Sequence, residues 1–195
     1  MKKIISIALA LLMVAVMLPV MAMAAEVTTA EALQTAVAAG DEVPLGDDII
    51  ASITVENGKP VTLNLNGHKL TNEAGKDTIY VEMGGTLIIN GAGTVDNISH
   101  VHAAVFNNGT VTLNGGTYTR SEEKGTGNPN SDNGNSWYTI CNHGVMTVNA
   151  GATVKNKGTF SSVFENGYYS YTKNAEREGY VEGTNNAAPK LTING

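Results

Sequence analysis

The chain has little cysteine, few aromatic residues and few charged residues, and these shortages limit how it can be stabilised. Among its 195 residues Cys141 is the single cysteine, so no intrachain disulfide can form. A lone cysteine is by default a buried, unreactive thiol. Aromatic residues make up only 6% of the chain, whereas there are 22 glycines, 21 asparagines and 21 threonines. This composition favours many short strands joined by tight turns.

Basic charge and long apolar runs are also scarce. Lysine and arginine total 12 against 18 acidic residues, for a formal charge of −6. Nucleic acid and anionic membranes both require a basic patch, so we exclude them as partners. After residue 24 no stretch is apolar enough to cross a bilayer. We therefore expect no membrane segment in the mature chain.

The first 24 residues have the pattern of a secretory signal peptide. Lys2 and Lys3 precede an apolar run over residues 4–20, and Ala22-Met23-Ala24 matches a cleavage site. An uncleaved membrane anchor is the alternative. Cleavage after Ala24 would remove both lysines and bring the formal charge to −8. The pattern predicts a secreted protein.

An apolar run that ends in Asn followed by a small residue recurs along the chain. The five copies end at residues 66, 90, 114, 149 and 194, which are separated by 24, 24, 35 and 45 residues. A period in the twenties with one short strand before each turn is typical of a stacked-coil array. A meander of hairpins is the competing interpretation, because Asn-Gly also favours hairpin turns.

We expect three strands per coil, which together form a triangular prism. Counting back from each Asn aligns a second strand at residues 79–82, 103–106 and 138–141, and a third run follows each turn. Alternation then places Leu65, Ile89, Leu113 and Val148 in one inward column. Asn66, Asn90, Asn114 and Asn149 should line up at one corner, where their amides can form a ladder.

A short helix is predicted directly before the first strand. Thr28 and Glu31 form a capping box, with Thr28 as the N-cap, and Gly40 can end the helix. Such a helix would cover the open end of the array, as a terminal cap must. We therefore divide the chain into a signal peptide at 1–24, a capping helix at 25–42 and a parallel β-helix at 43–195.

Two insertions explain the longer intervals between the repeated asparagines. The first covers residues 121–136 and the second residues 164–188, and both are predicted to leave the prism at the same corner, before the second strand. Insertions in solenoids gather on one edge and often carry binding residues.

The chain resembles the right-handed parallel β-helix proteins of the pectin-lyase-like superfamily. The resemblance is carried by Val61-Thr62-Leu63-Asn64-Leu65-Asn66-Gly67-His68-Lys69-Leu70, with its Asn-Gly-His turn, and by Gly46-Asp47-Asp48-Ile49 after the helix. It covers residues 26–195 and implies an all-β, three-sheet right-handed solenoid. The superfamily includes pectate lyases, polysaccharide hydrolases, tailspikes, adhesins and passive stalks. Because Gly195 directly follows a turn without a cap, we expect further domains of the same polypeptide.

The chain contains no recognisable catalytic pattern. Calcium requires six to eight oxygen ligands, and a glycosidase requires two carboxyl groups about 5 to 10 Å apart, yet acidic residues do not recur at matching strand positions. His100 and His102 have the spacing of a metal pair, but exposed histidines near a corner are favoured. Asp132-Asn133-Gly134-Asn135 lacks the Glu of a calcium loop. We predict no catalytic residue, metal or cofactor here.

Aromatic residues suggest a binding face instead. The predicted register gives three outward columns: Thr78, His102 and Trp137; Tyr80, Ala104 and Thr139; Glu82, Phe106 and Cys141. Exposed aromatic rings among Asn and Thr suit sugars. The alternative is that the insertions pack onto this face as a hydrophobic cluster. The predicted glycan-binding residues are Trp137, His102, Tyr80, Phe106, Tyr168, Tyr169 and Tyr171.

The sequence thus predicts a secreted or cell-surface β-helix module for display or adhesion, with carbohydrate as its candidate partner. The partner would be a polysaccharide or a host or cell-surface glycan, and attachment to the cell wall would come from segments beyond residue 195. The alternatives are a passive stalk and the N-terminal part of a polysaccharide lyase or glycoside hydrolase whose catalytic coils lie elsewhere. Fold analogy alone does not choose among them.

Overall fold

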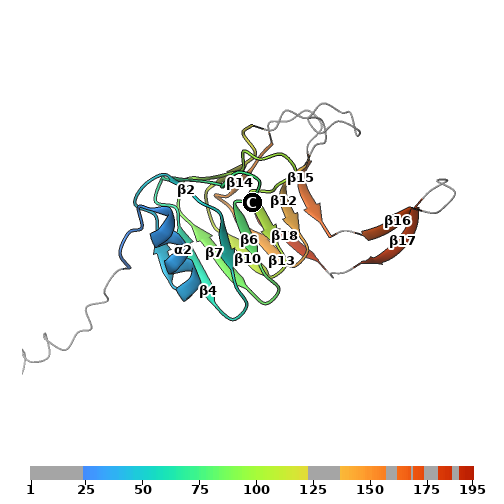
Figure 1. The fold of residues 1–195 in the computed structure, drawn as a ribbon, viewed down its shortest axis with the longest axis horizontal. Coiled ribbons are helices and arrows are strands. Elements are labelled where there is room, and N and C mark those ends of the chain that lie inside the picture. Colours follow the sequence, from blue (N-terminus) through green and yellow to red (C-terminus); the bar gives the residue numbers. More distant parts are fainter. Residues whose placement is uncertain (1–23, 123–136, 157–161, 168, 174–179, 186–188) are drawn as a thin grey trace, which may run out of the picture.

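The computed structural model describes residues 24–122, 137–156, 162–167, 169–173, 180–185 and 189–195. The predicted signal peptide lies almost entirely outside these residues, as does the Asp132-Asn133-Gly134-Asn135 segment. The one helix among them, α2 (Ala30–Ala39), lies at one end of a stack of strands (Figure 1). The helix buries Leu33 and Val37 against the core, so it covers the first coil as predicted.

The cap of this helix differs from the prediction by one residue. Thr29, rather than Thr28, is the N-cap, and its side chain accepts a hydrogen bond from the Ala32 amide at 3.2 Å. The pattern could not separate two adjacent threonines, because either hydroxyl can satisfy a free amide of the first turn. Gly40 ends the helix in the left-handed conformation (φ 82°), as expected.

Three all-parallel sheets form the body of the protein, and the chain visits them in turn, so that the fold is a parallel β-helix. The first sheet, in spatial order, contains β1 (Glu42–Pro44), β4 (Pro60–Asn64), β7 (Thr86–Asn90), β10 (Thr110–Leu113), β13 (Val145–Val148) and β18 (Lys190–Ile193). The second contains β14 (Thr153–Val154), β11 (Thr117–Thr119), β8 (Thr94–Asp96), β5 (Lys69–Thr71) and β2 (Ile49–Ile50). The third contains β15 (Ser162–Asn166), β12 (Tyr138–Asn142), β9 (Val105–Asn107), β6 (Ile79–Val81) and β3 (Ile53–Val55). Every pair within these sheets is parallel, which excludes the hairpin meander.

The interior is an array of stacked apolar side chains. Leu63, Ile89, Leu113 and Val148 are register partners in the first sheet, and all are buried. The prediction placed Leu65 in this column, and that residue instead lies just beyond β4. A slip of two residues keeps the same side chains inside, so hydrophobic alternation cannot detect it.

An amide ladder runs along the first sheet, with Asn64 where Asn66 was predicted. The amide of Asn90 donates to Asn64 at 3.0 Å, Asn114 to Asn90 at 2.8 Å, Asn149 to Asn114 at 2.7 Å and Asn194 to Asn149 at 2.8 Å. Asn66 adopts φ 50° in the turn and donates to the Leu45 carbonyl. The ladder is therefore confirmed, but its first member was misassigned.

A second ladder, which the sequence analysis did not predict, lies inside the corner after the third sheet. The Asn107 amide donates to the Asn142 side chain, and the Asn142 amide to Asn166, both at 2.7 Å. The side chains of Asn107 and Asn142 also donate to the carbonyls of Val145 and Lys190 on the first sheet. Because Asn107 and Asn142 are fully buried, these bonds satisfy amides that would otherwise be costly to bury.

The insertions leave the prism at different corners. The first lies between β11 and β12, as predicted. The second follows β15, because residues 162–166 continue the third sheet, and it contains the antiparallel pair β16 (Tyr169–Lys173) and β17 (Tyr180–Asn185). These two strands extend away from the prism (Figure 1). The shared-corner prediction was wrong because the run at 162–166 was counted as part of the insertion.

Candidate functional site

The outer side of the third sheet has a different register from the predicted one. Tyr80 pairs with Phe106, Phe106 with Cys141, and Cys141 with Glu165. The predicted columns had placed Tyr80 beside Ala104 and Glu82 beside Phe106, so residues 78–82 were misplaced by two. Corners of unequal length cause the error: β6 and β7 are joined by residues 82–85, whereas β9 and β10 are joined by 108–109.

This correction brings two aromatic residues into contact. The rings of Tyr80 and Phe106 stack with centroids 5.4 Å apart and an interplanar angle of 28°. Tyr80 is 36% exposed, and its hydroxyl accepts a hydrogen bond from the Asn108 amide at 2.9 Å. We call Tyr80 and Phe106 the platform. The neighbouring strands and Asn108 hold the platform in place, with Tyr80 as its more exposed ring.

A histidine and a glutamate border the platform. His143 contacts Phe106 edge-on with ring centroids 4.9 Å apart, and its Nε2 lies 3.2 Å from Glu165 Oε2. Cys141 lies between Phe106 and Glu165 in the register. Burial, together with the charge of Glu165, raises the pKa of the Cys141 thiol well above its usual range. A nucleophilic cysteine needs a lowered pKa, so this Cys–His–Glu group is not an activated nucleophile.

The other two predicted face residues lie at the opposite end of the strands. The pairing of Ile140 with Val105 places Trp137 in the register position of His102. His102 precedes Phe106 by four positions and lies before the start of β9 at Val105, and an extended chain of that length spans about 13 Å. Trp137 is half-buried and contacts Tyr138 edge-on at 5.9 Å, and its indole nitrogen is buried without a hydrogen-bond partner among the described residues. The predicted single face is thus divided into the platform and the Trp137 end.

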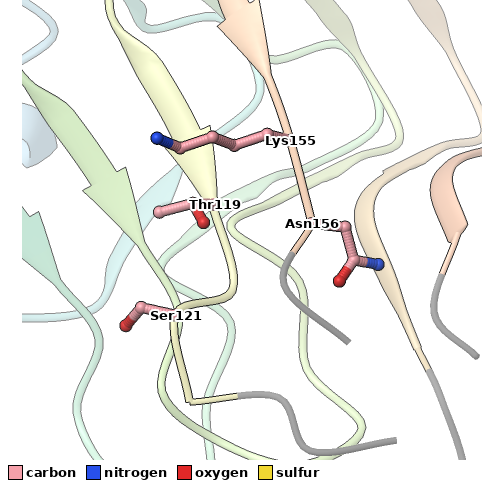
Figure 2. A pocket seen from close by; sticks show the side chains of 4 residues that line it. All are labelled: Thr119, Ser121, Lys155 and Asn156. Carbon is pink, nitrogen blue, oxygen red and sulfur yellow. The ribbon is translucent and has the colours of Figure 1, made fainter. Parts of the chain in front are cut away.

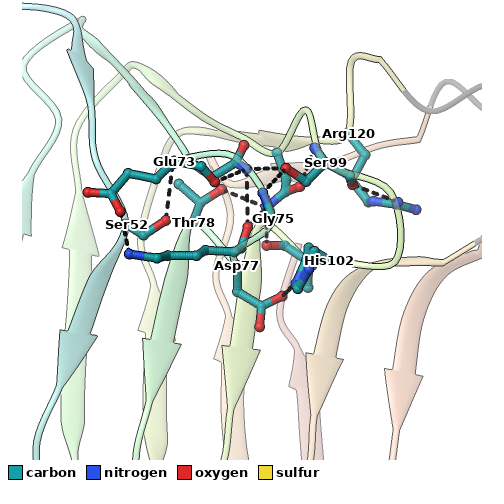
Figure 3. A network of polar contacts seen from close by, with 12 residues as sticks. Ser52, Glu73, Gly75, Asp77, Thr78, Ser99, His102 and Arg120 are labelled. Carbon is teal, nitrogen blue, oxygen red and sulfur yellow. Dashed lines mark hydrogen bonds and ion pairs between the residues drawn. The ribbon is translucent and has the colours of Figure 1, made fainter.

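His102 belongs to a polar network in the corner between the second and third sheets (Figure 3). Its Nδ1 lies 3.6 Å from Asp77 Oδ1, which also accepts a 2.6 Å hydrogen bond from the Ala103 amide. Burial raises the pKa of Asp77. Ser99 accepts from the amide of Gly75, and its carbonyl accepts from Arg120 at 3.3 Å. These contacts fasten successive coils together.

An ion pair between a partly exposed lysine and a buried carboxylate lies beside this network. Asp96 is fully buried, and its carboxylate accepts from Lys69 at 2.7 Å and from the Ser121 hydroxyl at 2.5 Å. The neighbouring pocket, about 360 Å³ in volume, is lined by Thr119, Ser121, Lys155 and Asn156 (Figure 2). None of these four is a carboxylate, so the pocket offers no acid pair for glycoside hydrolysis.

The remaining predicted residues cannot be tested by side-chain geometry. Tyr168 lies outside the described residues, and Tyr169 and Tyr171 are placed only as backbone positions of β16. His100 is half-buried beside the polar corner. Across the part of the chain that the structure describes, no three His, Cys, Asp or Glu residues are grouped so as to hold a metal.

Sequence reasoning missed Asn108 and His143 as parts of the face, together with the Asp77–His102 pair. Asn107-Asn108-Gly109 and Asn142-His143-Gly144 share an Asn-x-Gly pattern, and this was the available signal for the corner that holds both residues. No such signal existed for Asp77 and His102, because they are 25 residues apart and meet only once the coil lengths are known.

Comparisons with known proteins identify no relative. No family model, curated protein or solved structure matches the chain. Within the described ranges, no helix has the length and apolar character needed to cross a membrane.

Proposed function

We propose that the protein is a secreted or cell-surface β-helix module for display or adhesion, and that it binds carbohydrate on the outer side of the third sheet. The observation that carries this proposal is the stacked pair Tyr80 and Phe106, with Tyr80 exposed. The predicted signal peptide supports export. The finer assignment to the pectin-lyase-like superfamily is part of the same proposal and rests on the Asn-Gly-His turn and the three-sheet fold.

The chemistry of the platform suits a sugar. The C–H face of a pyranose ring can lie flat on an aromatic ring, while polar groups at its edge bond the hydroxyls. Asn108 provides such a group beside Tyr80, and His143 and Glu165 lie beside Phe106. A ligand that extends along the strands would reach Trp137, about 13 Å away.

The catalytic alternative receives less support from this face. Glu82 and Glu165 flank the platform, but Glu82 directly follows β6 and Glu165 lies in β15, and these two strands are three positions apart in the sheet, or about 14 Å. Retaining and inverting glycosidases use carboxyl groups about 5 to 10 Å apart. These two glutamates therefore do not form the acid pair of either mechanism.

A binding assay with single substitutions tests the proposal. Titration with a panel of polysaccharides should identify a ligand, and Tyr80→Ala should weaken its binding about tenfold, or about 1.4 kcal/mol. Ile50→Ala is the matched control, since Ile50 is 70% exposed on the second sheet, and it should bind as the unaltered protein does. Absence of binding to every polysaccharide, or equal loss in both variants, would overturn the proposal.

A further inference from the structure

We infer that the glycan recognised by the platform carries protonated amines, as does a polymer of amino sugars with free amino groups. This inference rests on the proposed function and specifies the charge of its ligand. It follows from the electrostatics of the third sheet rather than from its shape.

The platform itself favours a cation. Tyr80 is partly exposed over Phe106, and the hydrogen bond from Asn108 fixes its hydroxyl. The face of an aromatic ring has negative electrostatic potential and attracts an ammonium group within about 6 Å. An amine on a sugar ring that stacks on Tyr80 would lie in this range, whereas a carboxylate would be repelled.

Carboxylates near the platform act in the same direction. Glu82 follows Tyr80 by two residues, so alternation puts it on the same side, and no ion-pair partner for it is found among the described residues. Glu165 lies in the register row of the platform. The five strands of the third sheet contain no Lys or Arg.

Three basic side chains near the sheet each lie beside a carboxylate, while Arg120, in the corner between the second and third sheets, donates to the Ser99 carbonyl. Lys59 pairs with Glu56 at 2.8 Å, His143 lies 3.2 Å from Glu165, and His102 lies 3.6 Å from Asp77. From Glu82, from the absence of Lys and Arg on the five strands and from the formal charge of −6, we expect a negative field around the aromatic rings. Such a field raises the local concentration of cations and disfavours polyuronates.

Two forms of one polymer separate the contributions of charge and shape. The full chain is titrated in mildly acidic buffer with glucosamine oligosaccharides, with their N-acetylated counterparts and with polygalacturonate. We expect the free-amine form to bind at least about fivefold more tightly than the acetylated form, and to weaken as salt screens the charges. Polygalacturonate should not bind.

Two substitutions complete the test. Glu82→Gln should weaken binding of the free-amine form by about two- to fivefold, as expected for an exposed ionic contact, without affecting the acetylated form. Glu31→Gln, at an exposed position on α2, is the control and should change neither. Equal, salt-independent binding of both forms, a preference for polygalacturonate, or equal effects of the two substitutions would overturn the inference while leaving carbohydrate binding intact. Failure to bind any glycan would instead remove the proposed function itself.

Discussion

Polar side chains near the third sheet differ mainly in how far they are exposed to solvent. Tyr80 is exposed on the outer side of the third sheet, and Glu82, directly after β6, is half-buried. Asp77, three residues before Tyr80, is withdrawn into a corner beside His102. Burial raises the pKa of Asp77, so its ionisation is coupled to folding.

Substitution of Asp77 by Asn should make the protein less sensitive to pH. When folding raises the pKa of a carboxyl group, the group stabilises the fold most at pH values below its pKa in the unfolded chain, about 3.9. This stabilisation is lost as the pH rises through the pKa in the folded protein. Asn keeps the oxygen that accepts from the Ala103 amide and does not ionise. The urea midpoint should therefore fall less between pH 4 and pH 7 in Asp77→Asn than in the unaltered protein.

The exposed Asp41 provides the control for this prediction. Asp41→Asn should keep the pH dependence of the unaltered protein. If Asp77→Asn instead became less stable relative to the unaltered protein as the pH rises, a raised pKa of Asp77 would be contradicted.

At the scale of elements, the coils differ mainly at the corners between sheets, in their side-chain ladders and in how closely the backbones pack. The two asparagine ladders have the same chemistry in different surroundings: Asn114 is exposed, whereas Asn142 is fully buried. At the corner after the third sheet, Gly85, Gly109 and Gly144 stack so closely that a Cβ on Gly144 would lie 2.1 Å from the Gly109 carbonyl oxygen. Side-chain ladders and close backbone packing therefore define the corners.

Asn142→Ala should destabilise the fold more than Asn114→Ala. The Asn142 side chain bonds Asn107, Asn166 and the Lys190 carbonyl. Its loss removes a partner of the fully buried Asn107 amide, which should cost about 1–3 kcal/mol. Loss of Asn114 should cost about 0.5–1.5 kcal/mol, because water can replace it. Urea unfolding measures both, and equal costs would show that the inner ladder is hydrated.

Gly144→Ala should be poorly tolerated because the new methyl group would meet backbone and not a movable side chain. Overpacking typically costs about 1–3 kcal/mol and sometimes more. Val145→Ala, at the next and exposed position, adds no atoms and should cost little. A thermal melt in which the two variants are indistinguishable would mean that the corner can open without penalty.

The corners also explain how far sequence could predict this structure. Period, alternation and the Asn turn predicted parallel sheets, an inward Leu113 and an amide ladder. They misplaced Leu65, Asn66 and the 78–82 segment by two residues, because a two-residue slip leaves the inside and outside faces unchanged. The platform depended on the correct register, which is determined by corner lengths. Contact between Tyr80 and Phe106 was therefore beyond the reach of pattern analysis.

The whole molecule is stabilised by neighbour-to-neighbour stacking. Each coil contacts the coils before and after it, and the described fold contains no disulfide, its cysteine being free and buried. Stability in such arrays is approximately a sum of coil and interface terms. A defect in a central coil therefore affects two interfaces at once.

Leu113→Ala tests this central position. Leu113 is fully buried between Ile89 and Val148, and its truncation should cost about 2–5 kcal/mol. Lys190→Ala, on the exposed strand β18, should leave the melting temperature nearly unchanged. Similar melting of the two variants would contradict the inward placement of Leu113.

The number of stacked coils also determines the distance between the α2 end of the β-helix and the β16–β17 hairpin. Four coil steps separate the coil capped by α2 (β1 to β3) from the coil that precedes the β16–β17 hairpin (β13 to β15), a height of about 19 Å at about 4.8 Å per step. Duplication or loss of a whole coil would change that height by one step and keep both ends intact. The distance at which the hairpin is presented can therefore change only in discrete increments, while the length of a corner loop varies freely.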